Sequence, residues 1–190
     1  MIAEAAFRDH ISVMEEALRS LPATLERIAD DVYECFRRGN KLLACGNGGS
    51  ASDAEHLVAE LVGRYRDERR ALPAVALAGG MATITAVAND YGYDTVFARQ
   101  VEALATPGDV LVAISTSGNS RNVLAAVRAA RQRSCHIIGL TGAAGGELAM
   151  HVDTLIAAPS NVTARIQEVH ILCIHIICEA LDRKLLEGTR

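Results

Sequence analysis

The chain has 190 residues, of which half are hydrophobic and 22% are charged, and its formal net charge is −4. This length and composition favour one globular domain with a substantial core and exclude a disordered or fibrous chain. The acidic balance argues against a nucleic-acid partner, since such proteins usually present a basic surface to phosphates.

Cysteine usage and hydropathy indicate a protein of the reducing cell interior. The five cysteines include no CxxC pair, so we expect buried free thiols rather than a disulfide framework or a cysteine zinc site. We expect no signal segment, and no apolar run approaches the ~20 residues that span a bilayer. The predicted location is therefore cytoplasmic, with no membrane partner.

The hydrophobic pattern predicts an α/β fold. Residues 1–38 form two amphipathic helices that break at Pro22, and strand-like runs then alternate with helical ones. The expected strands are 41–45, 74–78, 110–114, 136–140 and 154–157. The expected helices are 50–64, 82–88, 95–104, 122–133, 146–150 and 163–186. This order predicts a doubly wound, Rossmann-like parallel sheet of five strands, in a single domain over 1–190 whose α/β core, 39–190, follows an N-terminal helical extension.

Two polar loops follow strands of this sheet, where open α/β folds bind ligands. In the first, GNGGS, the glycines permit close backbone approach and Ser50 can cap the next helix. The second, STSGNS, crowds four hydroxyls at a helix N-terminus, where unpaired N–H groups and the dipole favour an anion. Helix capping needs only one hydroxyl, so the sequence favours a phosphate cradle here. Its hydroxyls belong to Ser115, Thr116, Ser117 and Ser120.

Two helices carry groups suited to catalysis or metal binding. His56 and Glu60 are four residues apart and share one helix face, which fits either two metal ligands, a base beside its partner, or an ordinary exposed pair. Gln167, His170 and His175 interrupt an apolar final helix, and buried polar groups need partners. Because Gln167 and His175 lie roughly 12 Å apart along that helix, we expect a composite site that includes a residue of a neighbouring subunit.

Several separated motifs resemble one known family. They are GNGGSASDAEH, ELVGRY, LPAVAL, VANDYGYD, GDVLVAISTSGNS and RIQEVHILCIH, in this order along nearly the whole chain. With them the sequence resembles the sugar isomerase (SIS) domain and, within it, the sedoheptulose-7-phosphate isomerase family. The resemblance implies conversion of sedoheptulose 7-phosphate to D-glycero-D-manno-heptose 7-phosphate, the first step toward the heptose of bacterial surface polysaccharide.

The resemblance also implies roles for individual residues. Glu60 and His175 would be the general base and acid, and one zinc ion per subunit would be bound by His56, Glu60, Gln167 and His175. The serine and threonine loop would hold the substrate phosphate. Further substrate contacts would be Asn47, Gly48, Gly49, Ser50, Glu60, Arg64, Asn89, Asp90 and Gln167. No nucleotide cofactor is implied, and the expected assembly is a homotetramer.

This set of groups agrees with the chemistry of an aldose–ketose isomerisation. A base must move a proton between C1 and C2 through an enediol, and an acid must serve the two oxygens in turn. Fixed donors or a metal must stabilise the developing charge. One departure is at Thr163 and Ala164, where some relatives carry an acidic residue.

Three alternatives stay open from the sequence. A related family on this fold binds the replication initiator DnaA without catalysis, but it lacks the groups found here at Glu60 and His175. A sugar-phosphate-sensing module normally accompanies a DNA-binding domain, for which 190 residues leave no room. The third alternative is an isomerase of another ketose phosphate, because phosphate anchoring does not reveal the shape of the sugar pocket.

Overall fold

The computed structural model describes residues 1–187, and five strands in them form one parallel sheet of order β2-β1-β3-β4-β5. The strands are β1 (Leu42–Cys45), β2 (Ala74–Ala76), β3 (Val110–Ile114), β4 (His136–Thr141) and β5 (Thr154–Ala157). The predicted strands are thus all present. The strand expected over 74–78 is shorter, because the chain turns away after Ala76.

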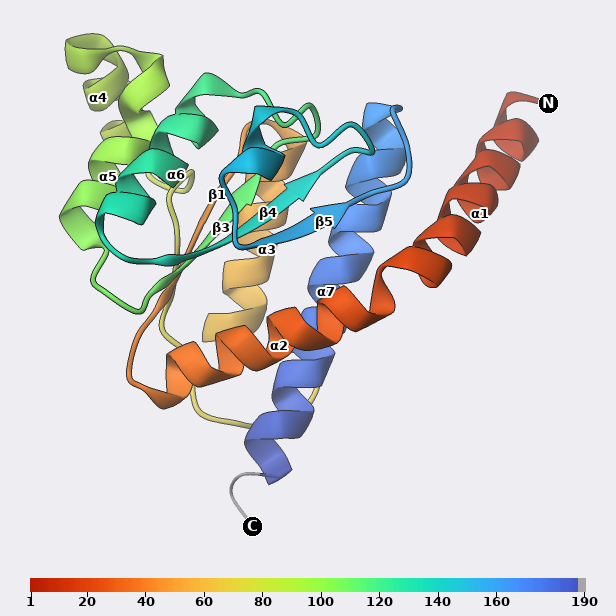
Figure 1. Cartoon of the computed structure of the whole chain (residues 1–190), viewed down its shortest axis with the longest axis horizontal. Helices are drawn as coiled ribbons and strands as arrows, with labels where there is room; N and C mark the ends of the chain where they lie inside the picture. Colours follow the sequence, from red (N-terminus) through yellow and green to blue (C-terminus); the bar gives the residue numbers. More distant parts are fainter. Residues whose placement is uncertain (188–190) are drawn as a thin grey trace.

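The helices cover both faces of this sheet, as the doubly wound prediction requires (Figure 1). They are α1 (Ile2–Ser20), α2 (Pro22–Arg37), α3 (Gly49–Val62), α4 (Met81–Tyr91), α5 (Val96–Leu104), α6 (Arg121–Gln132) and α7 (Thr163–Glu187). Two 3-10 turns, η1 (Tyr93–Thr95) and η2 (Glu147–Met150), complete the order. The helix predicted over 146–150 is therefore a single 3-10 turn.

The strands divide the core into two layers because their successive side chains point to opposite faces. Leu42 and Val110 face a cluster with the buried residues of α2, α3 and α7. Leu43 and Leu111 face a second cluster, built with α5 and α6. Both faces are buried, which explains why the strands read as continuous apolar runs.

The cysteines lie within these two layers, and all five are free and buried, as predicted. Cys35, Cys173 and Cys178 belong to the first cluster, and Cys45 and Cys135 belong to the second. Burial raises the pKa of each thiol, to about 11 for Cys35 and about 12 for Cys45. These thiols are therefore held in the protonated, unreactive form.

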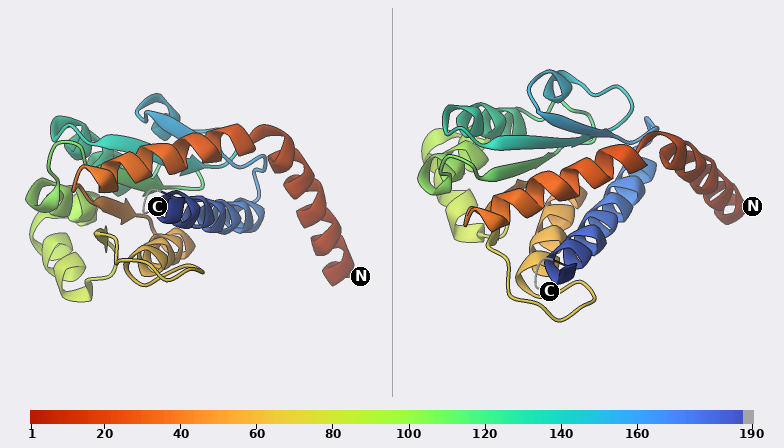
Figure 2. Two further views of the ribbon diagram at one scale, coloured as in Figure 1. Left: turned by 90° about the horizontal axis from the view of Figure 1, so that it is seen from below. Right: turned by 60° about the horizontal axis from the view of Figure 1, so that its bottom comes forward.

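Helix α1 extends away from the body beyond its junction with α2 (Figure 2). Its attachment to the first turns of α7 includes a contact of 2.6 Å between His10 Nδ1 and Glu168 Oε2, and a hydrogen bond from Arg165 to the Ala6 carbonyl. Apolar side chains such as Phe7 and Leu18 are more than two-thirds exposed on it. Among the described residues, no helix is both long and apolar enough to cross a bilayer.

Strand order places the switch point of the sheet between β1 and β3. These strands are neighbours, and the connections that follow them run to opposite sides, toward β2 and toward β4. In such sheets the crevice outside the carboxyl ends of the two strands is the usual ligand site. Both polar loops singled out in the sequence begin there.

Candidate active site

The two polar loops are joined by a pair of amide hydrogen bonds at the switch point. Asn47, in the loop after β1, donates from Nδ2 to Asn122 Oδ1 at 2.8 Å, and Asn122 Nδ2 donates back to Asn47 Oδ1 at 2.9 Å. Asn122 lies in the first turn of α6 and is only 3% exposed. The structure thus brings the glycine loop and the hydroxyl loop together, as predicted for one edge of the sheet.

Hydroxyl groups gather at the start of α6. Ser115 Oγ lies 2.9 Å from Ser120 Oγ and 3.4 Å from Ser117 Oγ. Ser120 is the N-cap residue of α6, but its side chain makes no capping hydrogen bond. Capping therefore does not explain this cluster, whose hydroxyls lie beside a helix N-terminus, where an anion is favoured.

A glycine fixes the path of the hydroxyl loop. Gly118 has a φ of +67°, and a Cβ added to it would lie 2.0 Å from the Gly145 carbonyl oxygen. The Thr116 carbonyl accepts a hydrogen bond from the Gly142 N–H, which ties the loop to the segment after β4. Within the described residues the Thr116 hydroxyl makes no hydrogen bond to the three serines, so its role in phosphate binding stays a prediction.

The glycine loop differs from the prediction at Ser50. Helix α3 begins at Gly49 with Gly48 as its N-cap residue, at a φ of +57° and with no side-chain cap. Ser50 is buried inside the first turn, so its expected capping role is wrong. Gly49 is needed for close approach instead, because a Cβ there would lie 2.3 Å from Gln167 Nε2.

Helices α3 and α7 run side by side in the same direction, with contacts at successive levels. Gln167 meets Gly49 at the first level, and His175 meets His56 at the second. The structure therefore keeps Gln167 and His175 at separate levels of a continuous helix, as their spacing predicts. It brings His175 to His56 within one chain.

The second level holds the predicted acid and base. His175 Nε2 lies 3.3 Å from His56 Nε2, which in turn lies 3.1 Å from Glu60 Oε1. The Tyr65 ring packs at 5.7 Å from the His175 ring. The Glu60 side chain is 22% exposed and that of His56 is 42% exposed, so a solute can reach this group.

These separations bear on whether the group suits zinc. Two ligands of a tetrahedral zinc at about 2.0–2.1 Å lie roughly 3.3 Å from each other, close to the distances from His56 Nε2 to its two neighbours. Imidazole and carboxylate are also ordinary zinc ligands. Within residues 1–187, however, no three His, Cys, Asp or Glu side chains are arranged as a metal-binding group. The pairs fit zinc, and a complete site requires a further donor such as the Gln167 amide.

A buried carboxylate lies one helical turn before His56. Asp53 is 9% exposed, and its Oδ2 has no hydrogen-bond partner among the described residues. Burial raises the pKa of Asp53 to about 6, and the nearby His56 opposes this shift. Asp53 is not distinguished in the sequence, since a lone aspartate on a helix is common.

The remaining predicted substrate contacts make no hydrogen bond, among the described residues, with the cluster of His56, Glu60 and His175. Asn89 and Asp90 lie at the end of α4 and bond to each other at 2.8 Å. Tyr93, just after them, donates its hydroxyl hydrogen to Asn47 Oδ1 at 2.9 Å. Arg64 is exposed and donates to the Arg66 carbonyl, so the structure does not bring it to the other site residues.

Asn122 and Tyr93 are not predicted site residues, yet both form hydrogen bonds with Asn47, a predicted substrate contact. Asn122 is the first residue of the predicted helix 122–133, and Tyr93 lies in the VANDYGYD motif, but the sequence predicts no separate role for either. A buried asparagine in the first turn after a polar loop is a usable signal. It indicates a side chain that bonds outside its own helix.

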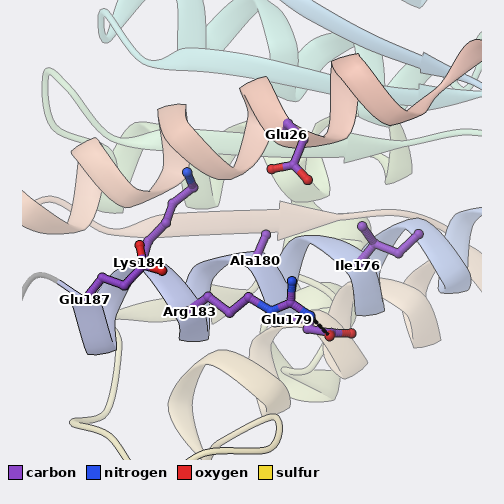
Figure 3. Close-up of a pocket in the computed structure, with 7 residues that line it drawn as sticks. All are labelled: Glu26, Ile176, Glu179, Ala180, Arg183, Lys184 and Glu187. Atoms are coloured by element: carbon purple, nitrogen blue, oxygen red, sulfur yellow. Dashed lines mark hydrogen bonds and ion pairs between the residues drawn. The ribbon is translucent and has the colours of Figure 1, made fainter.

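Other grooves lie away from the switch point. One of about 340 Å³ runs between α2 and α7 (Figure 3). Its lining includes Glu26, Glu179, Arg183 and Lys184, and it contains none of the predicted site residues. Charges of both signs neutralise each other there, so this groove is a weaker candidate than the switch point.

Comparison with known proteins connects this geometry to one activity. The model of the SIS domain matches residues 6–142. A phosphoheptose isomerase of Roseiflexus sp. (strain RS-1) is 53% identical over 177 residues, which are 93% of this chain and 90% of the relative.

Solved structures show the same likeness. The phosphoheptose isomerase GmhA of Neisseria gonorrhoeae is 46% identical and superposes with a TM-score of 0.91, over 95% of this chain and 97% of the other. A phosphoheptose isomerase of Francisella tularensis is 39% identical with a TM-score of 0.93, over 95% and 96% of the two chains.

Proposed function

The chain belongs to the phosphoheptose isomerase family of SIS-domain proteins, and we propose that it converts sedoheptulose 7-phosphate to D-glycero-D-manno-heptose 7-phosphate in heptose biosynthesis. The observation that carries this function is the contact of His175 with His56 and of His56 with Glu60, at the second level of α3 and α7. It supplies a carboxylate and an imidazole in one accessible cluster, as an enediol mechanism requires.

The reaction is a pair of proton transfers without net oxidation. Glu60 takes a proton from C1 of the ketose as the C2 carbonyl oxygen receives one from His175, which gives the enediol. Glu60 then returns a proton to C2, while His175 recovers one from the hydroxyl on C1, which becomes the aldehyde. Each group ends in its starting state, so one pair serves both directions.

Binding of the phosphate is assigned to the hydroxyl loop. Ser115, Ser117 and Ser120 already gather their oxygens, and each hydroxyl can donate to a phosphate oxygen. Thr116 is proposed to join them. The glycine loop, with Asn47, Gly48, Gly49 and Ser50, is proposed to contact the sugar chain.

The remaining proposed contacts come from three other segments. Asn89 and Asp90 lie just before Tyr93, whose hydroxyl donates to Asn47 of the glycine loop. The Gln167 side chain packs against Gly49. Arg64 is kept as a proposed contact only. It would have to leave the Arg66 carbonyl to reach the substrate.

Zinc is also part of the proposal, at one ion per subunit. His56, Glu60, Gln167 and His175 would hold it. When bound, zinc would polarise the two substrate oxygens and stabilise the charge on the enediolate. Because Gln167 lies one level away from His175, a neighbouring subunit is proposed to complete the site within a homotetramer. The protein is further proposed to work in the cytoplasm.

Conversion of sedoheptulose 7-phosphate, followed by NMR, tests this function. The purified protein is assayed as isolated, with a chelator, and with zinc added back. Conversion that chelation abolishes and zinc restores supports the enzyme and its metal together. Conversion that chelation does not change keeps the isomerase and rejects the zinc. No conversion by a folded protein under any condition contradicts the function and favours a binding role or another sugar phosphate.

A further inference from the structure

The side-chain amide of Asn47 is held on both sides by residues that the proposed function does not use. Its Oδ1 accepts hydrogen bonds from Asn122 Nδ2 and from the Tyr93 hydroxyl, both at 2.9 Å. Its Nδ2 donates to Asn122 Oδ1 at 2.8 Å. One acceptor atom with two donors is fully occupied, and one of the two Nδ2 hydrogens is left.

The backbone determines which way both amides face. Val123 N–H can only donate, and it lies 2.9 Å from Asn122 Oδ1. This contact fixes the oxygen of Asn122, so its Nδ2 is the atom that faces Asn47 Oδ1. Asn47 in turn cannot reverse its amide without placing nitrogen against nitrogen and oxygen against oxygen. Tyr93 adds a second donor to the same oxygen.

The same three residues connect three segments of the site. Asn47 belongs to the loop after β1, Asn122 to the start of α6 behind the hydroxyl loop, and Tyr93 to the turn after α4. Helix α4, which carries Asn89 and Asp90, has no buried residue. The Tyr93 hydroxyl, in the turn after this helix, provides a polar contact between that segment and the glycine loop.

We propose that Asn122 and Tyr93 are positioning residues that fix the Asn47 amide so that it offers the substrate a hydrogen-bond donor and no acceptor. This inference rests on the proposed function only in taking the ligand to be a sugar phosphate. The group that Asn47 meets must then be an oxygen acting as acceptor, such as a carbonyl, an enediolate or a hydroxyl lone pair. A sugar hydroxyl acting as donor finds no acceptor on this side chain.

The substitution Asn122→Asp tests the orientation directly. The introduced carboxylate keeps an acceptor for Val123 N–H but places an oxygen against Asn47 Oδ1. Because the carboxylate has no N–H, the Asn47 oxygen faces one of its two oxygens in either orientation. The reciprocal pair is therefore broken, and the Asn47 donor is no longer held in place for the substrate. We expect kcat/KM to fall about 10- to 100-fold. In an Asn47→Ala background the same change should cost less than twofold, because it acts through Asn47.

Tyr93→Phe provides a second test at an exposed position, where folding is not at risk. Tyr93→Phe removes one of the two donors to Asn47 and should lower kcat/KM about 2- to 10-fold. In the Asn47→Ala background the same substitution should lower kcat/KM by less than twofold. Tyr91→Phe is the matched control, since Tyr91 is similarly exposed and packs its ring on Arg99. We expect that control to keep the activity of the unmodified protein.

The outcomes separate this inference from the proposed function. Equal losses with and without the Asn47 side chain overturn the positioning role and indicate a general structural effect. Urea unfolding shows whether each variant folds. If Asn122→Asp does not fold, the result for Tyr93→Phe decides whether the positioning role holds. If the unmodified protein does not isomerise the sugar, the function fails. The same set of variants is then compared by calorimetric titration with sedoheptulose 7-phosphate, and additive losses of affinity overturn the inference.

Discussion

His175 Nε2 lies 3.3 Å from His56 Nε2, although 119 residues separate the two in the chain. Two neutral imidazoles can make this contact only if one of the two nitrogens carries a hydrogen. A cation bound to both lone pairs would satisfy them equally. The contact therefore connects the proposed acid to the proposed metal ligands.

Removal of one imidazole should abolish metal binding. We expect the unmodified protein to retain about one zinc per subunit after dialysis, and His56→Ala to retain almost none, because a two-imidazole site loses half of its nitrogen ligands. Elemental analysis measures the zinc content per subunit. His151→Ala, at the exposed residue directly after η2, is the control. Equal zinc in both variants would reject His56 as a ligand.

Glu60→Gln should remove most turnover and leave binding nearly intact. The amide keeps the shape of the side chain but cannot accept a proton from carbon, so we expect kcat to fall by 10²-fold or more. Affinity for the substrate, measured by titration calorimetry, should change less than about threefold. Glu55→Gln, exposed on the same helix, is the control. Unchanged turnover in Glu60→Gln would remove its assignment as the base.

Loss of a hydroxyl in the cradle should weaken binding more than catalysis. Ser117→Ala and Ser120→Ala each remove one donor to the phosphate, so we expect KM to rise about 5- to 20-fold with kcat nearly constant. Steady-state kinetics measures both. Ser20→Ala, whose hydroxyl bonds only within α1, should change neither. An effect confined to kcat would argue against a phosphate cradle.

Asp182→Asn should destabilise the fold. Asp182 is 1% exposed, and its carboxylate accepts from Arg69 Nε at 2.7 Å and from the Arg66 backbone N–H at 3.1 Å. A buried guanidinium without its partner charge costs about 3–5 kcal/mol. Urea unfolding should show this loss.

The matched control for this change is Asp67→Asn in the same loop, where the side chain is exposed. It should alter stability by less than about 0.5 kcal/mol. The Arg69 guanidinium also donates to the Glu60 carbonyl at 2.7 Å. A loss of stability as small as that of the control would show that Arg69 finds other partners.

Stability should fall with acidity because of His170. This side chain is fully buried and its Nε2 lies 3.0 Å from the Thr141 carbonyl. Burial lowers the pKa of His170 to about 4, against an ordinary value of 6.5. Between these values the unfolded chain binds the extra proton, so the folded state loses stability as the pH falls from 6.5 toward 4.

The size of this effect can be measured by substitution. From pH 7 to pH 5 the pKa shift predicts a loss of about 2 kcal/mol. The free energy of unfolding is measured in urea for the unmodified protein and for His170→Gln, at pH 7 and at pH 5. The stability of the unmodified protein relative to His170→Gln should fall by about 2 kcal/mol between these two pH values. A constant difference for His170→Gln would mean that the histidine is protonated in the folded state.

Sequence periodicity was sufficient for most of the fold. The strands at 110–114 and 154–157 match to the residue, because a buried parallel strand is a continuous apolar run with polar ends. The start of α3 was missed by one residue, since the choice between Gly48 and Ser50 as cap depends on a positive φ that no pattern reveals.

Contacts between distant segments were less accessible from the sequence. The i,i+4 spacing identified His56 with Glu60, but the meeting of His56 with His175 depends on how two helices align along each other. The amide pair of Asn47 and Asn122 spans 75 residues and needs two loops in one register. Only resemblance to a family pointed to Asn47, and it gave no role to its partner.

The positions of the cysteines allow local opening of the two core layers to be measured separately. Three cysteines lie on the α2, α3 and α7 side of the sheet and two on the α5 and α6 side, and no thiol can react while it stays buried and protonated. The rate at which a thiol reagent modifies each one then measures how often its layer separates from the strands. Different rates for Cys173 and Cys135 would mean that the two halves of the core open independently, and equal rates that they unfold together.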